Sequence, residues 1–246
     1  MIFGITSFVL IVGLSLRLTF GRYLSRLPEE NRKFTVKNFK DYIKWVAGWK
    51  FSFLKLERWD RCLDYLIAWG RKNYQGWTVW VFYPLALCYV YLALSGMFFA
   101  WFVKRGLYGF PLLLHVAAGA LFAISLTIVL FIKARVYLPE KLGPRAAAQE
   151  NQQKGGFWCP LLKKSIARIY LEALAFWVFV VAGFLLALST LGSMLPYFNY
   201  PAQIFFFHVH RWSALASVLA AILALDSIIV EVQAASAGER AEKPSR

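Results

Sequence analysis

The chain has 246 residues, of which 59% are hydrophobic, and a formal net charge of +15. Most of the charged residues lie outside long apolar runs, so the sequence predicts a membrane protein. The net charge alone would suit a nucleic-acid partner, but none is expected. Its three scattered cysteines form no C-x-x-C pair and no C-x-x-C-H, which argues against zinc, iron–sulfur or covalent c-type haem sites.

Five apolar runs have the length needed to cross a bilayer, which takes about 20 helical residues. They are 2–20, 78–103, 110–132, 169–195 and 204–232. None alternates with period two, so a β-barrel is not expected. The sequence predicts an all-α integral membrane protein with five transmembrane helices.

The chain divides into four parts. We expect a first transmembrane helix at 1–20, a basic, tryptophan-rich segment at 21–77, a four-helix bundle at 78–232 and a disordered polar tail at 233–246. Within the second part, LKLERWDRCLDYLIAWGRK at 54–72 has helical amphipathicity. It is interpreted either as an amphipathic helix on the inner membrane surface or as a docking surface for a cytoplasmic partner subunit. No internal repeat and no soluble domain is evident.

The basic residues are sorted between alternate loops. Segments 21–77 and 133–168 and the tail after 232 hold 13, 8 and 3 Lys/Arg, together 24 of the 28 in the chain. The positive-inside rule therefore places these segments in the cytoplasm and the N-terminus outside. We predict a multi-pass protein of the inner (cytoplasmic) membrane, in contact with the lipid bilayer.

The three histidines are His115, His208 and His210, each near the start of an apolar run. A histidine within a membrane helix is energetically costly and is a functional candidate. The runs 110–132 and 204–232 both pass from outside to inside, and His115 and His210 each lie about six residues along them, roughly 9 Å deep. Two neutral imidazoles at one depth can ligate one haem iron.

Neighbouring residues suit a porphyrin. Gly119 lies one turn after His115 and leaves room for a flat ring. Arg211, Lys104 and Arg105 lie near the outer surface and are candidates for pairing with haem propionates.

His208 and His210 differ by about 200° around a helix, so they cannot both face one iron. His210 lies deeper and is the preferred ligand. His208 is assigned either to a propionate or, if the helix is rotated, to the iron in place of His210.

The segments LLLHVAAGALFAISL, FFHVHRWSALASVLAAILAL and YLALSGMFFAWF resemble the four-helix cytochrome b subunits of respiratory formate dehydrogenases and nickel–iron hydrogenases. The resemblance covers roughly residues 75–232. It implies two haems, each held by two histidines, and the ligands of the outer haem match His115 and His210.

The ligands that the family uses for its inner haem are both missing. Phe82 or Tyr83 stands at one position and Ala224 at the other. We therefore expect a single, non-covalent haem b near the outer face. The family's quinone site lies beside the inner haem, so its place here is open.

The expected function is that of a haem b subunit in a respiratory-type complex. It would pass electrons between an outer-face iron–sulfur or cytochrome subunit and the membrane quinone pool. Asp226 and Glu231, near the inner face, are candidates for proton handling or are simply interfacial charges. The alternatives are a structural anchor subunit without a redox role and, less favoured, a small-solute transporter, for which broken helices are missing.

The sorting of basic residues makes the orientation testable. Cysteine-labelling of single-cysteine variants should place Gly155 inside and Asn199 outside. The opposite labelling pattern would contradict the orientation and move the haem site to the inner face.

Overall fold

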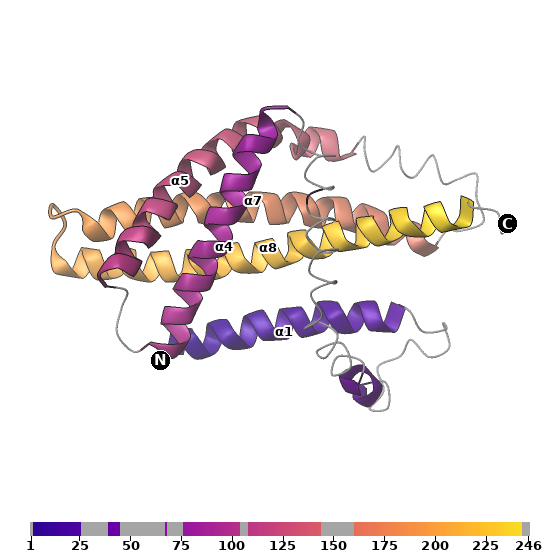
Figure 1. Ribbon diagram of the computed structural model, residues 1–246, viewed down its shortest axis with the longest axis horizontal. Coiled ribbons are helices and arrows are strands. Elements are labelled where there is room, and N and C mark those ends of the chain that lie inside the picture. The colour runs from indigo at the N-terminus through magenta and orange to yellow at the C-terminus, as the bar shows by residue number, and fades with distance from the viewer. Residues whose placement is uncertain are drawn as a thin grey trace. The chain divides into compact units, whose positions relative to one another are not determined.

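The computed structural model describes residues 2–25, 39–44, 67, 76–103, 108–143 and 160–242. This part of the chain contains no strand, and its five long helices are α1 (Ile2–Ser25), α4 (Thr78–Phe102), α5 (Phe110–Lys133), α7 (Pro160–Met194) and α8 (Tyr200–Glu242) (Figure 1). Each is long and apolar enough to cross a membrane. The predicted all-α class with five membrane-spanning helices is confirmed.

The chain forms two compact units. One comprises Met1–Ser7 with Gly76–Arg246, and the other comprises Phe8–Gln75. In the second unit, the ring of Phe20 on α1 meets the ring of Tyr42, on a short helix at 39–44, at a centroid distance of 5.0 Å. Thr19 Oγ1 lies 2.6 Å from Tyr42 Oη. Apart from Ile67, the predicted amphipathic segment 54–72 lies outside the described residues.

Two helical hairpins make up most of the first unit. Helices α4 and α5 pack on each other, as do α7 and α8, and α5 also packs on α7. The short 3-10 helix η2 (Ala134–Val136) and a helical turn at 139–143 follow α5. The turn between α7 and α8 and the start of α5 both lie toward the left of Figure 1. The ends of the two hairpins that carry the histidines therefore lie on the same side of this unit.

The apolar core joins three helices. Its buried members are Leu85, Cys88, Phe122, Leu126, Val129 and Val180. At its edge, the ring of Tyr89 packs edge-to-face on Phe179 at 4.8 Å, and its hydroxyl donates to Ser217 Oγ on α8 at 3.5 Å. Tyr89 thus connects the core to the fourth helix of the bundle.

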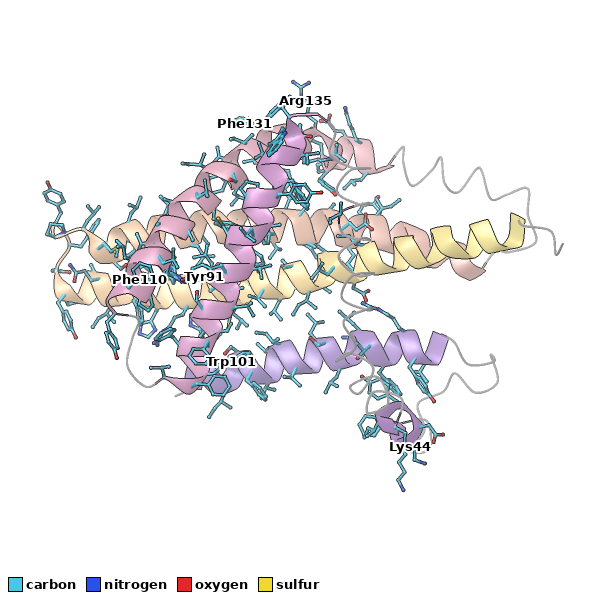
Figure 2. All side chains as sticks on the ribbon, in the orientation of Figure 1. Lys44, Tyr91, Trp101, Phe110, Phe131 and Arg135 are labelled. Carbon is cyan, nitrogen blue, oxygen red and sulfur yellow. The ribbon has the colours of Figure 1, made fainter. Side chains whose placement is uncertain are left out.

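Polar and apolar side chains are distributed as in a membrane-embedded bundle. The buried polar side chains on α5, α7 and α8 are all serines: Ser125, Ser189, Ser213, Ser217 and Ser227. Large apolar side chains face outward, and Leu87 and Phe131 are 75% and 78% exposed (Figure 2). Lipid tails are as apolar as a protein core, so helices in a bilayer keep their small polar residues for helix–helix contacts.

The first turns of α1 contact the end of α4 and an internal turn of α8. Trp101, near the end of α4, donates its indole N–H to Ser7 Oγ at 3.0 Å (Figure 2). Phe3 meets Trp212 of α8 edge-to-face at 5.5 Å. These contacts lie within the first unit.

Several helix ends differ from the prediction. Helix α1 continues to Ser25 rather than ending at residue 20, and α7 begins nine residues before the predicted apolar run. Helix α8 begins at Tyr200 because Asn199 caps it, its side-chain oxygen accepting the Ala202 N–H at 3.1 Å.

Helix α8 is assigned as far as Glu242, within the stretch 233–246 for which a disordered polar tail was expected. Residues 233–242 are rich in alanine and glutamate, which favour helix intrinsically, and only one glycine interrupts them. Polarity alone was a poor guide to the end of this helix.

Two glycines allow close approach of helices. A Cβ atom built on Gly183 of α7 would overlap Leu126 and crowd Phe122 of α5. A Cβ on Gly192 of α7 would lie 2.7 Å from the ring of Phe206 on α8. Leu126 is only 1% exposed, so it has little room to move away. Helix α7 therefore depends on glycine where it meets each neighbour.

We predict that Gly183→Ala destabilises the protein by about 1–3 kcal/mol, the usual cost of overpacking a core. Thermal unfolding of the purified protein in detergent measures this. Gly13→Ala is the control, since a Cβ there meets nothing within 4 Å. Equal melting temperatures for the two variants would show that α5 and α7 are not so closely packed.

Candidate functional site

His115 is held against α4 by its position at the start of α5. Gly109 caps the helix with φ of +63°, a left-handed conformation that favours glycine, and Pro111 follows in the first turn. His115 lies five residues after the helix start, and its Nδ1 atom is 2.9 Å from Ser95 Oγ on α4. A Cβ on Gly96 would be 3.7 Å from the ring Cε1 atom, so the imidazole lies over the Ser95–Gly96 step.

His210 makes the equivalent contact in the second hairpin. Its Nδ1 atom lies 3.1 Å from Thr190 Oγ1 and 3.3 Å from Ser189 Oγ, both on α7. Each histidine thus contacts hydroxyl groups of the helix that precedes its own. His115 has one such partner and His210 has two.

The hydroxyl groups fix the positions of the imidazole protons. Ser95 Oγ donates to Leu92 O at 3.3 Å. Ser189 Oγ and Thr190 Oγ1 both donate to Leu186 O, at 3.0 and 2.8 Å. A hydroxyl has a single proton, so an oxygen that donates to a carbonyl acts as an acceptor toward the imidazole. This pattern favours the neutral tautomer with the proton on Nδ1, in which Nε2 keeps its lone pair.

Neither Nε2 atom has a hydrogen-bond partner among the residues that the structure describes. Both imidazoles are only partly buried, and that of His210 also interacts with the backbone carbonyl of Leu186. An accessible Nε2 lone pair with Nδ1–H bonded elsewhere is the state in which histidine ligates metals.

The two histidines lie near each other. They are close enough for their charges to interact, although α5 and α8 have no extended contact within the described residues. A Cβ on Gly119, one turn after His115, would meet nothing within 4 Å, so space is open beside it. The donor set fits a haem iron, which takes two axial imidazoles.

The two histidines lie at unequal distances from the starts of their helices. His115 follows the start of α5 by five residues and His210 follows the start of α8 by ten, which correspond to about 7 and 15 Å of helix. The Asn199 cap starts α8 four residues earlier than predicted. The interaction between the two histidines therefore depends on how the hairpins pack, not on equal distances from helix ends.

The other candidate residues take different positions. His208 is exposed, whereas His210 is partly buried. The Arg211 guanidinium lies over the ring of Phe207, 4.2 Å from its centroid, and 5.8 Å from that of Phe3. Lys104 and Arg105 lie outside the described residues.

The residues expected at the inner side offer no second histidine pair, because all three histidines of the chain are His115, His208 and His210. The rings of Phe82 and Tyr83 lie 6.0 Å apart on α4, and Ala224 lies on α8. Asp226, also on α8, is partly buried and has an interaction partner. Glu231 is one of the later residues of the same helix. Within the described ranges, no three His, Cys, Asp or Glu residues gather where a bare metal ion could bind.

Ser95, Ser189 and Thr190 were not recognised as site residues from the sequence. The signal was present, since Leu-Ala-Leu-Ser occurs at 92–95 and again at 186–189. In both copies the serine donates to the leucine three residues earlier. His115 follows Ser95, and His210 follows Thr190, by 20 residues in each case. The match is limited to these four residues, and Thr190 directly follows its second copy.

Comparison with known proteins adds nothing to this geometry: no family model, no curated protein and no solved structure matches the chain. The resemblance to cytochrome b subunits stays a prediction from sequence. The best support for a function is therefore the pair of histidines whose Nδ1 atoms lie within hydrogen-bonding distance of hydroxyls inside an apolar bundle.

Proposed function

We propose that this protein is a haem b subunit of a membrane electron-transfer complex, with His115 and His210 as the axial ligands. The observation that carries the proposal is the arrangement of the two imidazoles, each hydrogen-bonded through Nδ1 and neither with a partner for Nε2 among the described residues. A haem bound by two histidines supplies reversible one-electron chemistry.

The protein's own residues have separable tasks in this proposal. His115 and His210 bind the iron through Nε2, and the hydroxyls of α4 and α7 orient their rings. Gly119 leaves space for the ring. The candidate partners for the haem propionates are His208, Arg211, Lys104 and Arg105. To bind a propionate, the Arg211 guanidinium would have to move partly off the ring of Phe207.

The wider role follows from where the site lies in the chain. We place the haem near the outer face, where an iron–sulfur or cytochrome subunit would exchange electrons with it. The N-terminus lies outside and the C-terminus in the cytoplasm, as the basic residues favour. A quinone at the inner side would complete the path, and Asp226 and Glu231 are its candidate proton-handling groups. Without inner ligands for a second haem, this path needs another carrier.

We predict that His115→Ala and His210→Ala each abolish the low-spin bis-histidine spectrum, because one iron needs both axial nitrogens. His208→Ala should retain it, since this side chain is exposed and His210 is the one directed at α7. Visible and electron paramagnetic resonance spectra of the purified variants measure the outcome. If the haem survives in His210→Ala but is lost in His208→Ala, the assigned ligand is wrong.

We also predict about one non-covalent haem per chain, because neither inner ligand position holds a histidine. A pyridine haemochrome assay against protein concentration gives the ratio. Two haems per chain would mean that an unrecognised residue acts as ligand. A chain purified from haem-sufficient cells without any haem would instead favour the structural anchor.

A further inference from the structure

The repeated contact between hydroxyl and imidazole suggests a role for three residues that no ligand assignment includes. Both histidines point Nδ1 at a hydroxyl located 20 residues earlier, across the tip of their own hairpin. The hydroxyl proton is already committed to a carbonyl of the same helix. The acceptor is thus presented in one orientation, and a neutral imidazole that bonds to it must adopt one tautomer.

We infer that Ser95 and the Ser189–Thr190 pair are positioning residues, which hold His115 and His210 in the Nδ1–H tautomer and aim Nε2 at a common metal centre. This inference rests on the proposed function for the identity of that centre, a haem iron. The part of the inference that concerns the histidine tautomers holds whether or not a haem is bound. None of the three hydroxyls is assigned a direct contact with the iron.

The two halves of the site are unequal. Ser95 is the one hydroxyl within hydrogen-bonding distance of His115 among the described residues, at 2.9 Å. His210 has Thr190 at 3.1 Å and Ser189 at 3.3 Å, both anchored to Leu186 O. Loss of one hydroxyl on α7 leaves another acceptor, whereas loss of Ser95 leaves His115 with none. Removal of Ser95 should therefore have the larger effect.

The hydrogen bond also affects the iron. When Nδ1–H donates to an acceptor, the imidazole becomes a more basic ligand. A more basic ligand stabilises ferric more than ferrous iron, so the bond lowers the midpoint potential of the haem. Removal of the acceptor should raise that potential and weaken haem retention, by about 10-fold or more if the effect is typical of outer-shell partners of metal ligands.

The first test is independent of haem. The full-length chain, labelled with ¹⁵N-histidine and produced without a haem supply, is reconstituted in lipid bilayers for solid-state nuclear magnetic resonance. The chain has only three histidines, so His208→Gln simplifies the spectrum to the two of interest. At a pH where both are neutral, His115 and His210 should show the shifts of the Nδ1–H tautomer. An Nε2–H tautomer at either position in the unmutated chain would overturn the inference for that half.

The second test uses the haem-loaded chain. Ser95→Ala should raise the midpoint potential and shift the electron paramagnetic resonance signal, while Ser95→Thr, which keeps the hydroxyl, should restore both. Thr190→Val and Ser189→Ala should each shift the potential less than Ser95→Ala, and the double variant should approach it. Ser125→Ala is the matched control, a serine on α5 that is only 5% exposed and makes no contact with either histidine.

The outcomes separate the two proposals. If the chain binds no haem but His115 and His210 are Nδ1–H tautomers that change in Ser95→Ala and in the Ser189/Thr190 double variant, the proposed function fails and the positioning role stands. If haem binds but potential, spectrum and tautomer in these variants equal those of Ser125→Ala, the positioning role fails and the proposed function stands. If Ser95→Ala does not fold, the tautomers of the unmutated chain and the potential of Thr190→Val still decide the inference.

Discussion

Every polar side chain inside this bundle must find its hydrogen-bond partner within the protein, because neither lipid nor the apolar core supplies one. The serine and threonine hydroxyls meet this requirement by donating to carbonyls one turn back along their own helices. Their oxygens then remain available as acceptors, and histidine N–H groups use them. The orientation of the two imidazoles is thus a consequence of hydrogen-bond satisfaction inside single hairpins.

Packing between the helices determines whether these half-sites come together. Gly183 and Gly192 let α7 approach α5 and α8 closely, and Tyr89 links α4 to α8 through Ser217. No such close packing joins α5 directly to α8, the two helices that carry the histidines. Among the described residues, the bundle is therefore held together through α4 and α7 rather than by extensive packing of α5 on α8.

Hydropathy was sufficient to predict the five helices long and apolar enough to span a membrane, because a run of about 20 apolar residues rarely occurs outside a transmembrane helix. Helix ends were less predictable. The Asn199 cap and the alanine-rich continuation after residue 232 are local effects that hydropathy does not detect. His115 and His210 stood out because histidine is rare in such helices. Ser95 and Thr190 did not stand out, because serine and threonine are common in such helices. Only their contacts with His115 and His210 distinguish them from other hydroxyls that bond to a backbone carbonyl.

The confinement of each imidazole–hydroxyl pair to one hairpin has a consequence for biogenesis. A hairpin of two helices can enter the bilayer as a unit, and Ser95 with His115, or Thr190 with His210, would be in contact as soon as that hairpin formed. Each hairpin could therefore orient its own histidine before the two hairpins pack together. Capture of the proposed haem would then be a late assembly step that joins two prepared halves, and the supply of haem would control how much of the chain matures.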